Sequence, residues 1–314
     1  MQSPMPLVVV LATGGTIAGT AAASTDTTGY RAGALGVDAL IAAVPALSDH
    51  RLEAESVAAI DSKNMDAATW QRLAARVAHH LARPEVAGVV ITHGTDTLEE
   101  TAYFLQRLLA PAKPVMLTAA MRPASALSPD GPANLLDAVT VAGTPGARGV
   151  GVVFAGAVWA AIGLRKVHTL QTGAFAGSDC GPVARLEGGV LRRFRDWPEG
   201  QALGIAHIDA EPDRWPRVEI VLNHAGADGR LVDAVVQSGA AGIVVAGTGH
   251  GTVSARLEAA LARARDAGVR VARASRCAFG PVLAHDDADR EAAGELSAVQ
   301  ARVELLLALL ARAP

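Results

Sequence analysis

The segment LATGGTIAGT, residues 11–20, directly follows the apolar run PLVVV of residues 6–10. This order predicts a buried strand that ends in a glycine-rich loop. Such a loop can hold a phosphate, but this one lacks both the GxGxxG and the GxxxxGK[ST] spacing. It is instead rich in hydroxyl groups, from Thr13, Thr16 and Thr20. A loop that carries a nucleophile is therefore the alternative to a loop that binds a nucleotide.

Hydrophobic runs recur along the chain, with helical patterns between them. Further buried strands are predicted at residues 86–94, 114–121 and 149–156. The intervening segments place apolar side chains at helical spacing, at residues 66–83, 97–110 and 130–143. Alternating strands and helices are typical of a parallel sheet with right-handed crossovers. Asp66 and Ser254 are expected to cap helices, and Thr97 with Glu100 fits a capping box.

The strand–helix pattern breaks after residue 190 and resumes near residue 217. Residues 191–216 are polar, charged and contain prolines, which is typical of a connection between domains. We therefore predict an α/β protein of two domains. The larger N-terminal domain, residues 1–190, has a mostly parallel sheet with flanking helices, and residues 217–314 form a smaller C-terminal α/β domain.

Composition excludes several classes of protein. The 314 residues are 50% hydrophobic, and 28 Lys and Arg oppose 31 Asp and Glu, so nucleic acid is not expected as a partner. The two cysteines, Cys180 and Cys277, form no CxxC pair, so neither a thiolate metal site nor a disulfide framework is predicted. No apolar stretch reaches about 20 residues, so no membrane span is expected. Because the first residues lack a basic segment before the apolar run, a cytoplasmic location is expected.

Polar residues gather where the predicted strands end. The segments THGTDTLEE, AAMRP and AGTGHGT occupy residues 92–100, 119–123 and 246–252. Ligands of open parallel sheets bind outside the carboxyl ends of the strands, so these loops are candidates for the site. A threonine hydroxyl is a weak nucleophile unless a base or a neighbouring charge activates it. Two threonines, an acid and a lysine would supply the nucleophile and the groups that activate it.

Three segments together resemble the bacterial L-asparaginase family, which includes the glutaminase-asparaginases. They are TGGTIAG at residues 13–19, THGTDTLEETAYFL at 92–105 and AMRPASALSPDGPANLLDAV at 120–139, and the similarity runs through nearly the whole chain. The resemblance implies hydrolysis of L-asparagine to L-aspartate and ammonia through an acyl-threonine, with no cofactor or metal. It also implies a homotetramer, a dimer of dimers, that acts on a small-molecule substrate.

The resemblance implies roles for individual residues. Thr16 matches the nucleophile, and Tyr30 matches a tyrosine on a mobile loop that bonds to it. Thr95 and Asp96 match the second threonine and its acid, which would also bind the substrate. Lys166 matches the lysine that completes this group. Either Tyr30 or Lys166 could take the proton of Thr16, and the polar 19–33 loop is expected to close over the substrate.

Further residues are expected to contact the substrate, and some of them depart from the family pattern. Backbone N–H groups of the glycine loop, around Gly15, are expected to stabilise an oxyanion, and Ser62 is expected to hold the substrate α-carboxylate. Lys63 and His250 depart from the family pattern: Lys63 lies near that carboxylate or points to solvent, and His250 lines the site or serves as a turn residue. Family members often contribute an acid from a neighbouring subunit, and Asp286, Asp287, Asp289 and Glu291 are all candidates for it.

Two alternatives remain beside asparagine hydrolysis. The first is a dual glutaminase-asparaginase or an amidase that acts on a related amide, since one methylene separates the two amino acids. The second belongs to another class, a protein that binds aspartate or asparagine and no longer turns it over.

Overall fold

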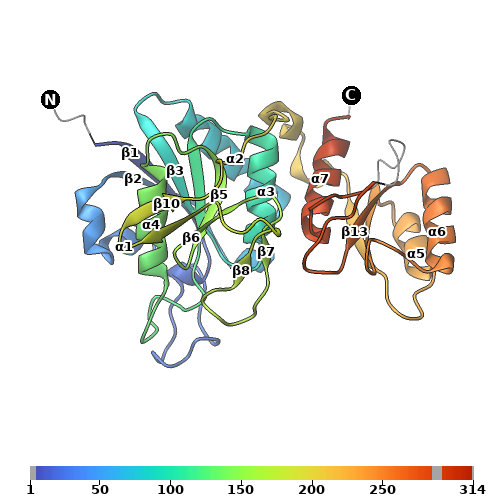
Figure 1. The fold of residues 1–314 in the computed structure, drawn as a ribbon, viewed down its shortest axis with the longest axis horizontal. Helices are drawn as coiled ribbons and strands as arrows, with labels where there is room; N and C mark the ends of the chain where they lie inside the picture. The colour runs from blue at the N-terminus through green and yellow to red at the C-terminus, as the bar shows by residue number, and fades with distance from the viewer. Residues whose placement is uncertain (1–4, 285–291, 313–314) are drawn as a thin grey trace. The chain divides into compact units, whose positions relative to one another are not determined.

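The chain forms two compact units, Met1–Ile205 and Ala206–Pro314, in the computed structural model (Figure 1). The structure describes residues 5–284 and 292–312. The predicted two-domain α/β architecture is confirmed, with a large, mostly parallel sheet in the first unit and a smaller α/β second unit.

The large unit is built on an eight-stranded sheet with the strand order β10-β9-β6-β5-β4-β3-β1-β2. Its strands are β1 (Leu7–Gly14), β2 (Arg51–Ile60), β3 (Val86–Thr92), β4 (Pro114–Thr118), β5 (Gly149–Phe154), β6 (Ala157–Ala160), β9 (Ala184–Glu187) and β10 (Val190–Arg193). The five strands from β5 to β2 are parallel, and β6, β9 and β10 add antiparallel neighbours. A separate two-stranded ribbon joins β7 (Arg165–Lys166) to β8 (Phe175–Ala176).

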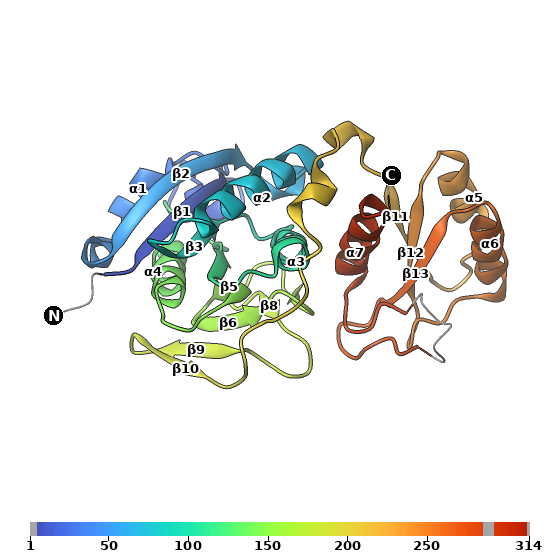
Figure 2. The ribbon, with the colours of Figure 1, turned by 90° about the horizontal axis from the view of Figure 1, so that it is seen from above.

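Four helices cover the two faces of this sheet. Figure 2 shows α2 (Ala67–Leu81) and α3 (Leu98–Leu109) on one face, and α1 (Val37–Ala42) and α4 (Gly131–Ala142) on the other. On the first face Trp70 stacks on Phe104, with ring centroids 4.8 Å apart, and its indole donates to Thr101. On the second face α1 and α4 share one apolar cluster with the even-numbered residues of β1.

The connection through α4 departs from the predicted right-handed crossovers. From β3 to β4 and from β4 to β5 the chain steps in the same direction along the sheet, yet α3 and α4 lie on opposite faces (Figure 2). The two connections must therefore have opposite hands, and the connection through α4 is the one that differs from those through α1, α2 and α3. Placed there, α4 covers apolar residues such as Val8 and Val90, which the six-residue α1 alone leaves bare.

The edge strand β2 was not predicted because none of its residues is buried and charged residues interrupt its first half. Charged contacts help to hold it against α2. Arg76 binds both carboxylate oxygens of Glu55, at 2.6 and 2.8 Å, and His80 lies 2.9 Å from the same carboxylate. The predicted caps of α2 and α6 (Ala255–Asp266) are confirmed, since Asp66 and Ser254 accept from backbone N–H groups of those helices.

The bounds of the expected connection, residues 191–216, stay a prediction, and its first residues form a strand. Strand β10 pairs with β9 over four residues, so residues 191–193 belong to the large sheet. Short 3₁₀ turns follow at Ile205–Ile208 and Pro212–Arg214. The polar composition of this stretch therefore reflects an exposed edge strand as well as a connection.

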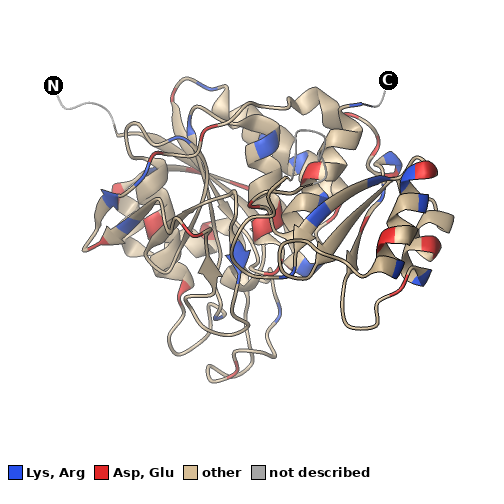
Figure 3. Ribbon diagram, turned by 45° about the vertical axis from the view of Figure 1, so that its right-hand side comes forward, with Lys and Arg blue, Asp and Glu red and all other residues tan. Residues whose placement is uncertain are grey.

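The small unit has a parallel sheet in the order β11-β12-β13, formed by Val218–Leu222, Gly242–Gly247 and Arg270–Ser275. Helices α5 (Arg230–Gln237) and α6 pack on one face, and α7 (Ala298–Leu310) packs on the other (Figure 2). In Figure 3 acidic and basic residues are interspersed along α5 and α6, and ion pairs such as Arg263–Asp233 join them. Across the described residues, no helix is long and apolar enough to cross a membrane.

Candidate active site

Three loops at the carboxyl ends of β1, β2 and β3 meet at the level of the backbone. Gly14, the last residue of β1, and Gly15, which follows it, have positive φ angles of 106° and 82°. A Cβ on Gly15 would lie 2.5 Å from the Cα of Gly94 in the loop after β3, and a Cβ on Gly94 would lie 2.5 Å from the Oγ of Ser62 in the loop after β2. Glycine is needed here because it alone adopts these angles without strain and permits such close approach.

The backbone of Gly15 is itself part of this junction. Its N–H donates to the carbonyl of Ile60 at 2.9 Å, and its carbonyl accepts from Gly33 at 3.0 Å. This N–H is therefore bonded within the loops and does not point at an oxyanion. The sequence had suggested the opposite for N–H groups of this loop. A part for Gly15 in substrate binding stays a prediction, and its visible contribution is to set the spacing of the loops.

The hydroxyl of Thr16 meets the phenol of Tyr30. Thr16 begins a 3₁₀ turn, η1 (Thr16–Ala18), and is buried. Its Oγ1 lies 2.6 Å from the hydroxyl of Tyr30, which comes from the 19–33 loop. Backbone bonds in both directions between Thr20 and Arg31, at 3.1 and 2.9 Å, close the base of that loop next to Tyr30. The fold thus brings together two residues that are 14 positions apart in the chain.

A second cluster joins the loop after β3 to strand β7. The Nζ of Lys166 donates to the Oγ1 of Thr95 at 2.9 Å and to the Oδ1 of Asp96 at 2.6 Å. The side chain of Lys166 is only 19% exposed, while that of Asp96 is 52% exposed. The carboxylate therefore remains open to a second cation, such as the ammonium group of a ligand.

Ser62 connects this cluster to the loop after β2. Its buried Oγ accepts from the backbone N–H of Asp96 at 3.2 Å, and its carbonyl accepts from the hydroxyl of Thr97 at 2.8 Å. Because Thr97 uses its hydroxyl on Ser62, it makes no side-chain cap for α3. The predicted capping box of Thr97 and Glu100 is therefore wrong, and Thr97 serves the site instead.

Lys63 extends from the turn η3 (Ser62–Asn64) toward solvent. Its Nζ forms an ion pair with Asp61 at 2.9 Å, and its side chain is 66% exposed. The hydrogen bond from Lys63 to Asp61 raises the pKa of Lys63, and the charges of Asp96 and Tyr30 contribute less to this shift. Lys63 therefore points outward, and its charge still acts electrostatically on Asp96 and Tyr30.

Glu99 belongs to the site and was not predicted. It lies in the first turn of α3, and its Oε2 accepts from the backbone N–H of Lys166 at 3.0 Å. Burial raises the pKa of Glu99 to about 7, and the like charge of Glu100 adds to the rise. The bond from Lys166 and the charge of Arg165 act in the opposite direction. Its position three residues after Asp96, on a helix that begins at a strand end, was the signal available in the sequence.

The histidine that precedes the glycine of this loop is structural. His93 is fully buried, and this burial lowers its pKa to about 4. Its Nδ1 lies 2.7 Å from the carbonyl of Gly94, so the neutral ring donates there. Thr13 is similarly structural, because its hydroxyl donates to the carbonyl of Thr92 at 3.0 Å and ties β1 to β3.

Other predicted residues lie away from these clusters in the chain. His250 belongs to the small unit, in the turn after β12, where its Nε2 accepts from the backbone N–H of Leu283 at 2.8 Å. The four acids of the segment at 286–291 lie outside the described residues. Among residues 5–284 and 292–312, no group of three or more His, Cys, Asp or Glu side chains is arranged to hold a metal ion. Cys180 and Cys277 are exposed and form no disulfide with each other.

Two clusters, the pair Thr16–Tyr30 and the group of Lys166, Thr95 and Asp96, together suit acyl transfer to a hydroxyl. A buried threonine hydroxyl that touches a phenol can pass on its proton and attack a carbonyl carbon. The partly open carboxylate of Asp96 suits the ammonium group of an amino acid. In the part of the chain that the structure describes, no hydrogen bond joins Thr16 directly to Thr95 or Lys166.

Two family models match the chain. The model described as asparaginase, N-terminal, covers residues 7–198, and that described as glutaminase/asparaginase C-terminal domain covers residues 217–313.

Similar proteins match over nearly the full length. L-asparaginase 2 of Bacillus subtilis is 38% identical, with 98% of this chain and 84% of the relative covered. The glutaminase-asparaginase of Pseudomonas fluorescens is also 38% identical, over 96% and 86% of the two chains. The crystal structure of a probable cytoplasmic L-asparaginase from Campylobacter jejuni is 36% identical and has a TM-score of 0.90, over 97% of this chain and 95% of the other.

Proposed function

The chain belongs to the asparaginase family, and we propose that it hydrolyses the side-chain amide of L-asparagine to L-aspartate and ammonia through an ester formed on Thr16. The observation that carries the mechanism is the 2.6 Å contact between the Thr16 and Tyr30 hydroxyls, in a buried loop at the carboxyl end of β1. The naming of the relatives as asparaginases supports the substrate.

The reaction divides into two acyl transfers. The Oγ1 of Thr16 gives up its proton and attacks the amide carbon, and the amide nitrogen takes up a proton and leaves as ammonia. Water then attacks the resulting ester, aspartate leaves, and Thr16 regains its proton. Each step develops charge on the substrate oxygen, which donors in the loops at the strand ends would stabilise.

The second cluster is proposed to bind and orient the substrate. Asp96 would pair with the substrate ammonium group through its exposed carboxylate, and Ser62 would hold the α-carboxylate. Lys166 orients the carboxylate of Asp96 and the hydroxyl of Thr95 by donating to both. Lys63 would add positive charge at the rim of the site, on the side of the α-carboxylate.

Substitution of the nucleophile tests this mechanism. We expect Thr16→Ala to fold and to lose activity by about 10³-fold or more, because the covalent route is removed. Thr28→Ala is the matched control, since Thr28 is an exposed threonine of the same 19–33 loop, whose hydroxyl reaches only Asp26, at 3.4 Å. Ammonia release from asparagine measures both variants. Near-normal activity in Thr16→Ala would exclude Thr16 as the nucleophile.

A dual glutaminase-asparaginase is the alternative, favoured by the relative from Pseudomonas fluorescens that bears this name. Discrimination of one methylene supplies only about 1–3 kcal/mol. Steady-state ammonia release from both amides decides, and a kcat/KM for glutamine equal to that for asparagine would establish dual activity. If the protein binds aspartate but releases no ammonia from either amide, it is a binding protein that has lost turnover.

Assembly and location are also proposals. A homotetramer with sites completed at subunit contacts would give His250 and the acids of 286–291 a place near a neighbouring site. A cytoplasmic location is supported by the similarity to the cytoplasmic enzyme of Campylobacter jejuni. Mass measurement in solution and fractionation of cells test the two statements.

A further inference from the structure

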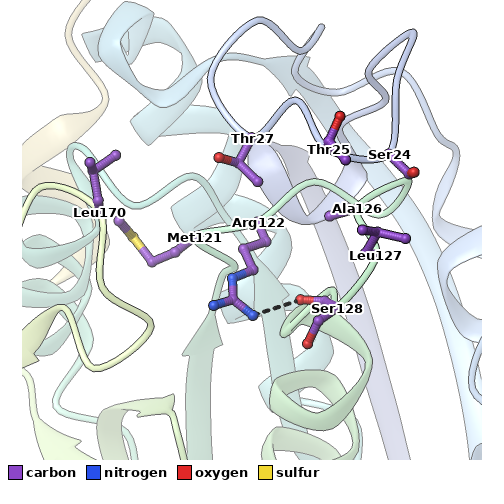
Figure 4. A pocket seen from close by; sticks show the side chains of 9 residues that line it. All are labelled: Ser24, Thr25, Thr27, Met121, Arg122, Ala126, Leu127, Ser128 and Leu170. Carbon is purple, nitrogen blue, oxygen red and sulfur yellow. Dashed lines mark hydrogen bonds between the residues drawn. The ribbon is translucent and has the colours of Figure 1, made fainter.

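A cavity of about 410 Å³ separates the 19–33 loop from the loop of residues 121–130. Figure 4 shows Ser24 and Thr27 on one side of it, and Met121 and Leu127 on the other. Leu127 is 77% exposed, so it does not pack the two loops together. Because the space between the loops is open, apolar packing contributes little to holding the 19–33 loop in place.

Hydrogen bonds join the two loops where packing does not. The N–H of Ala124 donates to the carbonyl of Gly19 at 2.9 Å, and the N–H of Leu127 donates to the carbonyl of Ser24 at 3.0 Å. A third bond uses a side chain, because the N–H of Ala21 donates to the Oγ of Ser125 at 2.8 Å. Of these three bonds, this one alone can be removed by a side-chain substitution.

The two ends of the 121–130 loop are tied to each other, and the residues that flank it are anchored by Asn134. Both carboxylate oxygens of Asp130 accept from consecutive backbone N–H groups, those of Met121 at 3.0 Å and Arg122 at 2.9 Å. Asn134 is buried on α4 and binds the carbonyl of Ala119 and the N–H of Ala155. The base of the 121–130 loop is therefore held by side-chain hydrogen bonds, and the loop serves as a platform for the 19–33 loop, which is held mainly by hydrogen bonds.

A short path leads from Ser125 to the proposed nucleophile. Ala21 follows Thr20, which forms the two backbone bonds with Arg31. Arg31 in turn follows Tyr30, whose hydroxyl touches Thr16. Any movement of the loop at Ala21 is therefore transmitted to Tyr30 through one pair of backbone hydrogen bonds.

We propose that Ser125 is a positioning residue for catalysis, because its hydroxyl holds the 19–33 loop on the 121–130 platform and so keeps Tyr30 on Thr16. The proposal rests on the assignment of Thr16 and Tyr30 to the reaction. Ser125 does not touch the substrate in this mechanism, and it acts only through the loop.

The experiment compares Ser125→Ala with Ser128→Ala. Ser128 lies in the same loop, and only its carbonyl is bonded, to Arg122, so its hydroxyl is dispensable. We expect Ser125→Ala to lower kcat/KM for asparagine about 3- to 10-fold, the ratio typical for loss of one hydrogen bond. Ser128→Ala should match the wild type, and Ser125→Thr, which keeps a hydroxyl, should recover most of the activity.

Hydrogen exchange supplies a readout that does not depend on turnover. We expect amides of residues 20–31 to exchange faster in Ser125→Ala than in the wild type or Ser128→Ala, with unchanged exchange in β1 and α4. Equal exchange and equal kcat/KM in the two alanine variants would overturn the proposal while leaving the proposed function intact. If the wild type releases no ammonia at all, the proposed function fails, and unchanged exchange in Ser125→Ala alone would then refute the loop contact.

Discussion

Glu99 makes the stability of the large unit depend on pH. Its carboxyl is partly buried in the first turn of α3, where burial raises its pKa from the ordinary 4.5 to about 7. Glu99→Gln removes the titrating group, and the amide oxygen can still accept from the backbone N–H of Lys166 at 3.0 Å. The substitution therefore isolates the charge from the hydrogen bond.

The size and sign of the effect follow from the pKa of Glu99 in the two states. Below about pH 4.5 Glu99 is protonated in the folded and the unfolded chain, so its charge costs nothing. As the pH rises to 7 the unfolded chain ionises first, and the free energy of unfolding falls. The fall is complete about one pH unit above the folded pKa of about 7, and it amounts to about 3 kcal/mol, since each pKa unit corresponds to about 1.4 kcal/mol. Glu99→Gln lacks this fall.

Urea unfolding at pH 5 and pH 8 measures the difference. Trp70 stacks on Phe104 of α3, so tryptophan fluorescence reports the region that Glu99 occupies. We expect the free energy of unfolding of Glu99→Gln, relative to wild type, to increase by about 2–3 kcal/mol from pH 5 to pH 8. Glu100→Gln is the control from the same turn, and it should change this dependence far less. Parallel pH profiles for wild type and Glu99→Gln would refute the argument.

Two further substitutions test the site. Lys166→Met removes the donor to Thr95 and Asp96 at similar side-chain length. We expect kcat for ammonia release to fall by about 10²-fold or more, with the melting temperature little changed. A kcat within tenfold of wild type would contradict the assigned role. Gly15→Ala would force a Cβ to within 2.5 Å of the backbone of the loop after β3 at a φ of 82°, so we expect loss of at least about 2 kcal/mol of stability by chemical unfolding. Gly36→Ala, where a Cβ meets nothing within 4 Å, is its control, and equal losses would argue against the close approach.

The buried strands could be predicted because each is an uninterrupted hydrophobic run in the sequence. β1, β4 and β5 are buried at every residue, and β3 is buried at every residue but Ala87, so each appears as an apolar run between glycines or prolines. β2 could not be predicted, since it lies at the edge and is held partly by ion pairs to α2 that no local pattern reveals. The hand of the connection through α4 also escapes local patterns, because it depends on which face of the sheet remains uncovered.

The contacts between site residues also divide into those that the local sequence reveals and those that it does not. Thr95 and Asp96 are neighbours in sequence, so their proximity was certain, whereas their contact with Lys166 spans about 70 residues and was expected only from the family resemblance. The contact of Thr97 with Ser62 was mistaken for a helix cap, since a threonine at the start of a helix has both uses. Glu99 was missed because a glutamate in the first turn of a helix is common and its burial is invisible in the sequence.

The placement of the two clusters bears on how Thr16 loses its proton. Its hydroxyl contacts Tyr30 at 2.6 Å, while the bonds of Lys166 go to Thr95 and Asp96. We infer that the proton leaves through Tyr30, and that Lys166 acts on the substrate-binding side. Tyr30 belongs to a loop held over an open cavity by hydrogen bonds, whereas Lys166 belongs to β7 and its backbone N–H is bonded to Glu99 of α3. Activation of Thr16 would then depend on closure of the loop, so that the nucleophile is primed only when the loop covers the site.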